Sequence, residues 1–251
     1  MDQNQSNNEK VHNLIILDES GSMGGIRNSI IQGFNEIVKN IKELKQENPQ
    51  QEHSISFVSF NSIVSKEMHF MEDVNRLQEL NVKNYSPDGG TPLFDVMGFS
   101  LTKLDKFITN QDNVHVFVSI LTDGEENASR IYSGSTIKKL VESLKEKNWT
   151  FTYIGADHDV EKMAEKLSIN NHMAFDKSES GMGMMFAKEK SARKMYMASS
   201  SKSLFSMGNM FKDDDALDLN DTIPSTQVNN KKVTQVNSGS NKSFWKKLTG
   251  K

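Results

Sequence analysis

Three oxygen-bearing side chains follow the first apolar run of the sequence at alternating positions. Residues 11–18 read VHNLIILD and end in an acid. Asp18, Ser20 and Ser22 then form the pattern D-x-S-x-S within DESGSM. A carboxylate and two hydroxyls supply hard oxygen donors, which Mg²⁺, Mn²⁺ and Ca²⁺ prefer as ligands. The segment therefore predicts a site for a hard divalent cation, with Mg²⁺ the first choice and Mn²⁺ or Ca²⁺ as alternatives.

Two further oxygen donors occur at comparable places in the chain. Thr91 lies in GGTP, just before a segment with helical periodicity, and Asp123 ends the apolar run of VHVFVSILTDGEEN (114–127). Two carboxylates and three hydroxyls supply five donor groups, one fewer than an octahedral ion takes. One coordination position is therefore left for water or for an acid from outside the chain.

The elements that must position these residues alternate along the chain. Apolar runs bounded by turn residues predict strands, and apolar residues three or four positions apart predict helices. Strands are expected in 11–18, 53–61, 63–71, 114–127, 149–157 and 172–176, the third pairing with the second as a hairpin. Helices are expected at 26–45, 93–108, 135–147 and 160–167, with one or two helical turns in 74–82.

This alternation predicts an α/β fold over residues 9–176. The expected architecture is a doubly wound, mainly parallel central sheet with helices on both faces. Right-handed crossovers place the C-terminal ends of parallel strands at one edge of such a sheet. The loops that carry Asp18, Thr91 and Asp123 are therefore expected to meet at that edge.

The motifs and the fold together resemble a von Willebrand factor type A (vWA) domain with a metal-ion-dependent adhesion site. The matching segments are DESGSM, GGTPLFD and TDGEEN, and the resemblance covers about two thirds of the chain. It implies a Rossmann-like, non-catalytic protein-binding module. In such domains the equivalents of Ser20 and Ser22 contact the metal directly, that of Thr91 directly or through water, and those of Asp18 and Asp123 largely through water. An aspartate or glutamate of the protein partner completes the shell.

Other residues near these motifs have simpler interpretations. Glu19, Glu125 and Glu126 are interpreted as solvated charges, because isolated acids in loops are usually exposed. Thr91 is placed to cap the helix that begins near Pro92, a residue that a first helical turn tolerates.

The strongest enzymatic alternative is Mg²⁺-dependent phosphoryl transfer with Asp18 as nucleophile. The haloacid dehalogenase-like phosphatases place a second aspartate two positions after the nucleophile, and here that position is Ser20. The glycines of GSMGG fit neither G-x-G-x-x-G nor G-x-x-x-x-G-K-[ST]. No arrangement of serine, histidine and aspartate for hydrolysis emerges either. The sequence therefore favours a protein without enzymatic activity.

The remaining parts of the chain differ from the predicted domain in composition. Residues 1–8 are polar and predicted to be disordered, and 177–211 is a Met- and Ser-rich segment that includes the last helix of the domain in the favoured interpretation. Residues 212–251 are predicted to be a low-complexity, disordered tail. Its end, 242–251, groups Phe, Trp and Leu with four lysines, an amphipathic pattern that suits a partner groove or a membrane surface.

Charge and composition limit the kinds of molecule that the protein is expected to bind and the compartment in which it is expected to work. Residues 1–176 contain 17 Lys/Arg against 26 Asp/Glu, and 177–251 contain 13 against 7, so the predicted domain is acidic and nucleic acid is not expected as its partner. There are no cysteines, signal-peptide pattern or transmembrane segment, so a cytoplasmic location is expected. In the family that the chain resembles, some intracellular members act with AAA+ ATPases and some in bacterial stress responses such as tellurite resistance. A protein in which the tail is the main recognition element, as an adaptor in such a complex, is the second alternative.

Overall fold

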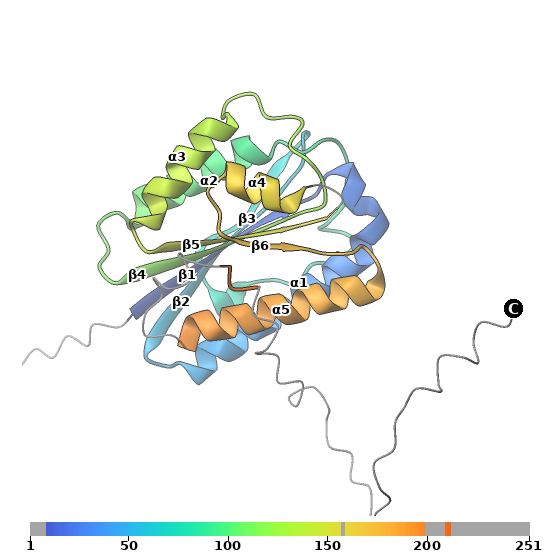
Figure 1. Ribbon diagram of the computed structural model, residues 1–251. Coiled ribbons are helices and arrows are strands. Elements are labelled where there is room, and N and C mark those ends of the chain that lie inside the picture. Colours follow the sequence, from blue (N-terminus) through green and yellow to red (C-terminus); the bar gives the residue numbers. More distant parts are fainter. Residues whose placement is uncertain (1–8, 157–158, 199–208, 212–251) are drawn as a thin grey trace, which may run out of the picture. The chain divides into compact units, whose positions relative to one another are not determined.

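The computed structural model describes residues 9–156, 159–198 and 209–211. The chain divides into two units, Met1–Ala216 and Leu217–Lys251. The second unit lies outside the described residues, as do the predicted disordered segments 1–8 and 212–251. Within the first unit, a central sheet is covered by helices on both faces (Figure 1).

Six strands form this sheet in the order β3-β2-β1-β4-β5-β6. All neighbours are parallel except β2 and β3, which form the predicted antiparallel hairpin. The doubly wound, mainly parallel sheet is therefore confirmed, with these strands: β1 (Glu9–Asp18), β2 (Gln51–Phe60), β3 (Ser65–Asp73), β4 (Val114–Thr122), β5 (Trp149–Gly155) and β6 (Asn171–Ala174).

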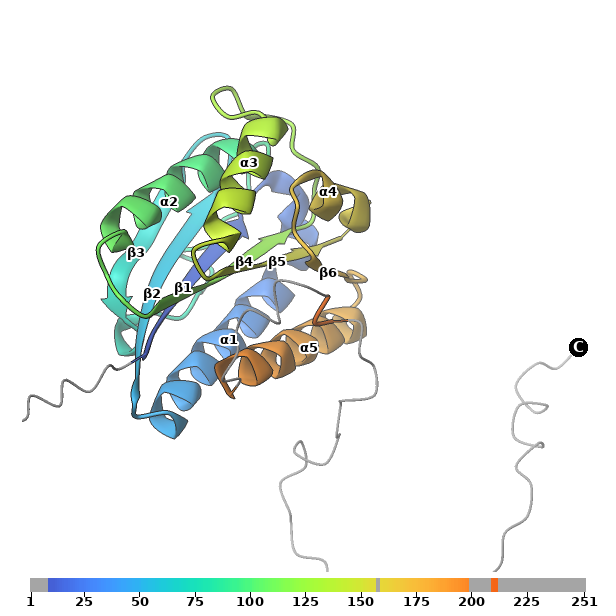
Figure 2. The same ribbon diagram turned by 60° about the vertical axis from the view of Figure 1, so that its left-hand side comes forward.

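The helices divide between the two faces of the sheet. Helices α2, α3 and α4 pack on one face, and α1 and α5 lie side by side on the other (Figure 2). Their bounds are α1 (Arg27–Glu47), α2 (Leu93–Ile108), α3 (Gly134–Lys145), α4 (Val160–Lys166) and α5 (Glu179–Ala198), with 3₁₀ turns η1 (Gly21–Ile26) and η2 (Val74–Arg76). None of the helices in the described residues is both long enough and apolar enough to cross a membrane.

The periodicity of α1 and the continuous apolar run of β1 have the same origin, which is burial. The predicted stripe of α1 is buried throughout: Ile30, Phe34, Ile37, Ile41 and Leu44. Each such side chain stabilises the fold by about 1.5–3 kcal/mol when fully withdrawn from water. β1 has parallel neighbours on both sides and helices over both faces, so it has no need of a polar face.

Helix α5 lies within the Met- and Ser-rich segment and packs closely on α1. Met182 and Met185 are buried in the core between them. A Cβ added to Gly33 would lie 1.7 Å from the Phe186 ring, so the absence of a side chain in α1 makes room for that ring. Further along α5, Arg193 reaches the sheet, where it donates to Asn13 Oδ1 at 2.5 Å. The last helix is thus held by both apolar and polar contacts.

Candidate metal centre

Asp18 lies at the C-terminal end of β1 and is fully buried. Its Oδ1 accepts from the Ser20 backbone N–H at 2.7 Å, and its Oδ2 accepts from Thr122 Oγ1 at 2.6 Å. Burial raises the pKa of this carboxyl and the charge of Asp123 acts in the same direction, while the hydrogen bonds from Thr122 and Ser20 oppose the shift. A cation beside the carboxylate would favour its charged form.

Ser20, Ser22 and Asp123 form a continuous chain of oxygen atoms across two loops. Ser20 Oγ and Ser22 Oγ are 3.1 Å apart, and Ser22 Oγ donates to Asp123 Oδ1 at 2.6 Å. Ser20 and Asp123 are buried, whereas Ser22 is exposed. The pairing of β1 with β4 brings these residues together, because both strands end at the same edge of the sheet.

Thr91 is buried, and its backbone is held from both sides by Asn127. Thr91 N–H donates to Asn127 Oδ1 at 2.8 Å, and Asn127 N–H donates to the Thr91 carbonyl at 3.2 Å. The prediction that Thr91 caps α2 is wrong, since the N-cap residue is Pro92 and makes no side-chain capping bond. The acceptor for the Phe94 N–H is instead Glu126 Oε2, at 2.8 Å. The Thr91 hydroxyl therefore does not cap the N-terminus of α2.

Gly124 keeps the space between the loops open. A Cβ at this position would lie 3.3 Å from Ser22 Oγ and 3.6 Å from Thr91 Oγ1, so both hydroxyls border the same small space. We call the group that lines it the oxygen cup: Asp18, Ser20, Ser22, Thr91 and Asp123. In the described part of the chain, no three acidic or histidine side chains come together as a metal site, so an ion here would depend on hydroxyls and water as well as carboxylates. Such a donor set fits a hard divalent cation.

The family model for the von Willebrand factor type A domain matches residues 14–202. The chain belongs to this family. The match begins within β1, extends past the end of α5 and contains all five residues of the oxygen cup. Domains of this family are generally protein-binding modules. None of the curated proteins compared with the chain matches it.

Several solved structures are similar to this vWA domain at low sequence identity. One is a von Willebrand factor type A protein from Catenulispora acidiphila, with 15% identity, 74% of this chain and 43% of that chain covered, and a TM-score of 0.47. The pilus adhesin SpaC from Lactobacillus rhamnosus GG, in an open conformation, has 13% identity, coverages of 75% and 30%, and a TM-score of 0.52. The SpRpn10 VWA domain has 11% identity, coverages of 72% and 94%, and a TM-score of 0.46. The chain spans less than half the length of the first two proteins.

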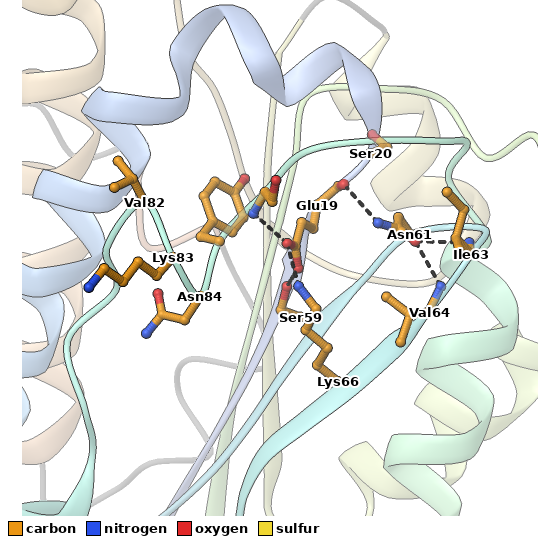
Figure 3. Close-up of polar contacts among 12 residues, drawn as sticks. Glu19, Ser20, Ser59, Asn61, Ile63, Val64, Lys66, Val82, Lys83 and Asn84 are labelled. Carbon is orange, nitrogen blue, oxygen red and sulfur yellow. Dashed lines mark hydrogen bonds and ion pairs between the residues drawn. The ribbon is translucent and has the colours of Figure 1, made fainter.

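Glu19 does not behave as the solvated charge that the sequence suggests. Its side chain is fully buried, and its Oε1 accepts from Ser86 N–H at 2.5 Å and pairs with Lys66 Nζ at 2.6 Å (Figure 3). Ser59 donates to its other oxygen. The Glu19 carbonyl also accepts from Asp88 N–H at 2.9 Å. Glu19 therefore fastens the loop before Thr91 to the end of the sheet.

Glu125 and Glu126 differ from each other in how far their side chains are exposed to solvent. Glu125 is exposed, in agreement with its interpretation as a solvated charge. Glu126 is half-buried and accepts from the N–H groups of Ala128 and Ser129 as well as from α2. The interpretation of Glu126 is therefore wrong, because its carboxylate supplies acceptors that the loop and the helix N-terminus would otherwise lack.

Lys177 reaches the oxygen cup of the vWA domain and was not identified from the sequence. Its Nζ lies 2.7 Å from Asp123 Oδ2, the oxygen that Ser22 does not contact. The residue follows β6, a parallel strand whose C-terminal end shares the edge of the sheet with β1 and β4. A lysine directly after the last predicted strand was the available signal, since every loop at that edge approaches the same place.

A hollow of about 680 Å³ is lined by Pro92, which follows Thr91, and by Asn127, which is bonded to Thr91, but by none of the cup residues. The loop between β2 and β3, the start of α2 and residues 127–130 line it. Ile63 and Phe99 are among its lining residues and are 71% and 53% exposed. The surface beyond Pro92 and Asn127 is therefore partly apolar.

Proposed function

We propose that this vWA domain is a non-catalytic module that binds Mg²⁺ in the oxygen cup and, through the ion, an acidic side chain of a protein partner. The observation that carries the proposal is the convergence of oxygen donors from three loops around the space that Gly124 leaves open. Mn²⁺ and Ca²⁺ have related ligand preferences and are the alternative ions.

Each residue has a proposed role that follows from its chemistry. The hydroxyls of Ser20, Ser22 and Thr91 supply neutral oxygens to the ion, and Asp18 and Asp123 supply the negative charge around it. Because three of the five donors are neutral hydroxyls, a divalent ion would remain attractive to a further carboxylate. The partner's aspartate or glutamate would take that coordination position.

The burial of Asp18 favours binding over phosphoryl transfer. A carboxylate nucleophile needs a lone pair that can reach a phosphorus atom. Both oxygens of Asp18 accept short hydrogen bonds, and its side chain has no exposed surface. We therefore retain the proposal that the domain is not an enzyme. The cytoplasmic location stays a prediction, and the adaptor role of the tail concerns residues outside the described part of the chain.

Calorimetric titration of the full chain with Mg²⁺ tests the ion site. Wild type is expected to bind, and Asp18→Asn and Thr91→Ala are expected to weaken binding by tenfold or more, about 1.4 kcal/mol. Thr109→Ala is a matched control, because Thr109 follows α2 as Thr91 precedes it and is exposed. The absence of heat with Mg²⁺ or Mn²⁺ at millimolar concentration would contradict the site.

A second experiment tests the role of the ion in partner binding. Proteins captured on the full chain in Mg²⁺ and released by EDTA are identified, and binding is repeated with Asp18→Asn and with a chain lacking residues 241–251. The proposal expects loss of capture with Asp18→Asn and retention without the tail. An isolated partner should also lose binding when one of its own acids is changed to the amide. Capture that depends on the tail and ignores EDTA would favour the adaptor alternative.

A further inference from the structure

The ion pair between Lys177 and Asp123 differs from an ordinary surface pair. The Asp123 side chain has no exposed surface, and that of Lys177 is 27% exposed. The two oxygens of Asp123 are engaged on opposite sides, Oδ1 by the Ser22 hydroxyl at 2.6 Å and Oδ2 by the ammonium at 2.7 Å. A full positive charge therefore lies against one of the two carboxylates of the oxygen cup.

A divalent ion in the cup would be close to this ammonium, because both use the same carboxylate. Like charges a few ångströms apart repel each other, and little water separates groups at a buried carboxylate. On the basis of the proposed ion site, we infer that Lys177 is an internal competitor of the divalent ion, which sets how strongly the cup binds it. The Lys177 ammonium neutralises the Asp123 carboxylate in the absence of the ion. The ion pair must break when the divalent ion binds next to that carboxylate.

Positioning of Asp123 does not require the lysine. Its backbone directly follows β4, and Ser22 fixes one oxygen. The ammonium is on a flexible four-carbon stem and is partly exposed, so it has a route into water when it leaves the carboxylate. A fully enclosed cation would have no such route.

Lys66 forms a second pair between a lysine and a buried carboxylate at the same edge of the sheet, and its side chain is 35% exposed. Lys66 pairs with Glu19, but that carboxylate also accepts from Ser59 and from the Ser86 N–H. Glu19 would thus keep two partners if its cation moved away. Asp123 would keep only Ser22 among the contacts described above, so its second oxygen is suited to exchange between the ammonium and a metal ion.

Titration of Mg²⁺ into Lys177→Met and Lys177→Arg tests the inference with the full chain. Removing the charge is expected to raise the Mg²⁺ affinity by about tenfold, since even strongly screened unit charges at close range produce an effect of this size. Lys177→Arg keeps the charge and is expected to stay within about twofold of wild type, the size of effect expected when no charge changes. Lys106→Met, at an exposed position of α2, has the same net charge as Lys177→Met and controls for it.

A second readout separates this inference from the ion site itself. In EDTA, Lys177→Met is expected to melt at a lower temperature than wild type, because Asp123 loses its cation, and Lys106→Met is expected to melt as wild type does. Unchanged Mg²⁺ affinity in Lys177→Met would overturn the inference, and weaker affinity would make Lys177 a positioning residue. If no variant binds Mg²⁺, the proposed function fails and the competition fails with it; the melting difference then reports only the ion pair.

Discussion

Two buried carboxylates of this domain are paired with cations in different ways. Arg193 and Glu189 are both enclosed between α5 and the sheet, with side-chain exposures of 0% and 1%. The guanidinium also donates to Asn13 and Ser119 and lies 4.6 Å from the centre of the Phe117 ring. In contrast, the cation that pairs with Asp123 is partly exposed and comes from a loop at the edge of the sheet.

The difference shows how the surroundings of an ion pair decide its role. The arginine has several fixed partners and no path to water, so breaking its pair leaves an isolated charge in the interior. The lysine at the cup has a path to water, so its pair can be exchanged for another cation. We therefore expect the first pair to determine stability and the second to determine ligand binding.

The largest effect is expected for Arg193→Met. This change leaves Glu189 buried without its cation, a situation that destabilises proteins by about 3–5 kcal/mol. Chemical denaturation should show this loss. Lys194→Met, next to it on the exposed side of α5, should change stability by less than about 0.5 kcal/mol. Equal stability of Arg193→Met and wild type would remove the distinction between the two pairs.

A second prediction concerns another enclosed group, His12. It lies between the hydroxyls of Ser54 and Ser56, at 2.6 and 3.0 Å, and burial lowers its pKa to about 3. The histidine pKa in the unfolded chain is about 6.5. Between about pH 6.5 and pH 3, His12 is therefore protonated in the unfolded chain and neutral in the folded chain. Stability should fall as the pH falls from about 6.5 toward 3, by about 1.4 kcal/mol for each pH unit.

The contribution of His12 is measurable as a difference in slope. Denaturation of wild type and His12→Gln between pH 7 and pH 4 should give a shallower acid dependence for the variant, because other titrating groups are common to both. Parallel curves would show that His12 accepts a proton while folded and would contradict its enclosure.

Gly124→Ala should weaken Mg²⁺ binding at the oxygen cup and leave stability almost unchanged, the reverse of the effects expected at Arg193 and His12. A methyl group there would stand 3.3 Å from Ser22 Oγ and 3.6 Å from Thr91 Oγ1. We expect Mg²⁺ affinity to fall by about tenfold, or 1.4 kcal/mol, while the denaturation midpoint changes little. Calorimetry and denaturation of the same samples would check this, and a large loss of stability would show that the two regions are not independent.

The smallest effect is expected for the exposed pair of Lys39 and Glu43 on α1. Their charged atoms are 3.9 Å apart, and both side chains are well exposed. Such a pair contributes about 0.3–0.5 kcal/mol. Lys39→Met should therefore alter neither the denaturation curve nor Mg²⁺ binding measurably. A solvent-exposed ion pair would then affect neither stability nor ligand binding, unlike the two pairs that involve buried carboxylates.

The sequence predicted those features that depend on local patterns. Helix α2 has the predicted bounds, because its apolar periodicity begins directly after a proline, and the stripe of α1 is buried as expected. The roles of Glu19 and Lys177 could not be derived in this way. Glu19 is buried by the loop around Ser86, and Lys177 contacts a carboxylate two strands away in the sheet order. Their contacts depend on how distant segments come together, which local periodicity does not encode.

The pairing of β1 with β4 has a consequence for the nascent chain. Ser22 and Asp123, which share a hydrogen bond, are 101 positions apart, and Asp18 and Thr122 are 104 apart. The loop with Thr91 and the hairpin partner of β2 are made in between. Neither of these two hydrogen bonds can therefore form until β4 has been synthesised, and Lys177 is synthesised later still. An incomplete chain contains the D-x-S-x-S motif but not the assembled oxygen cup. Only a fully folded molecule can therefore present this surface to another protein.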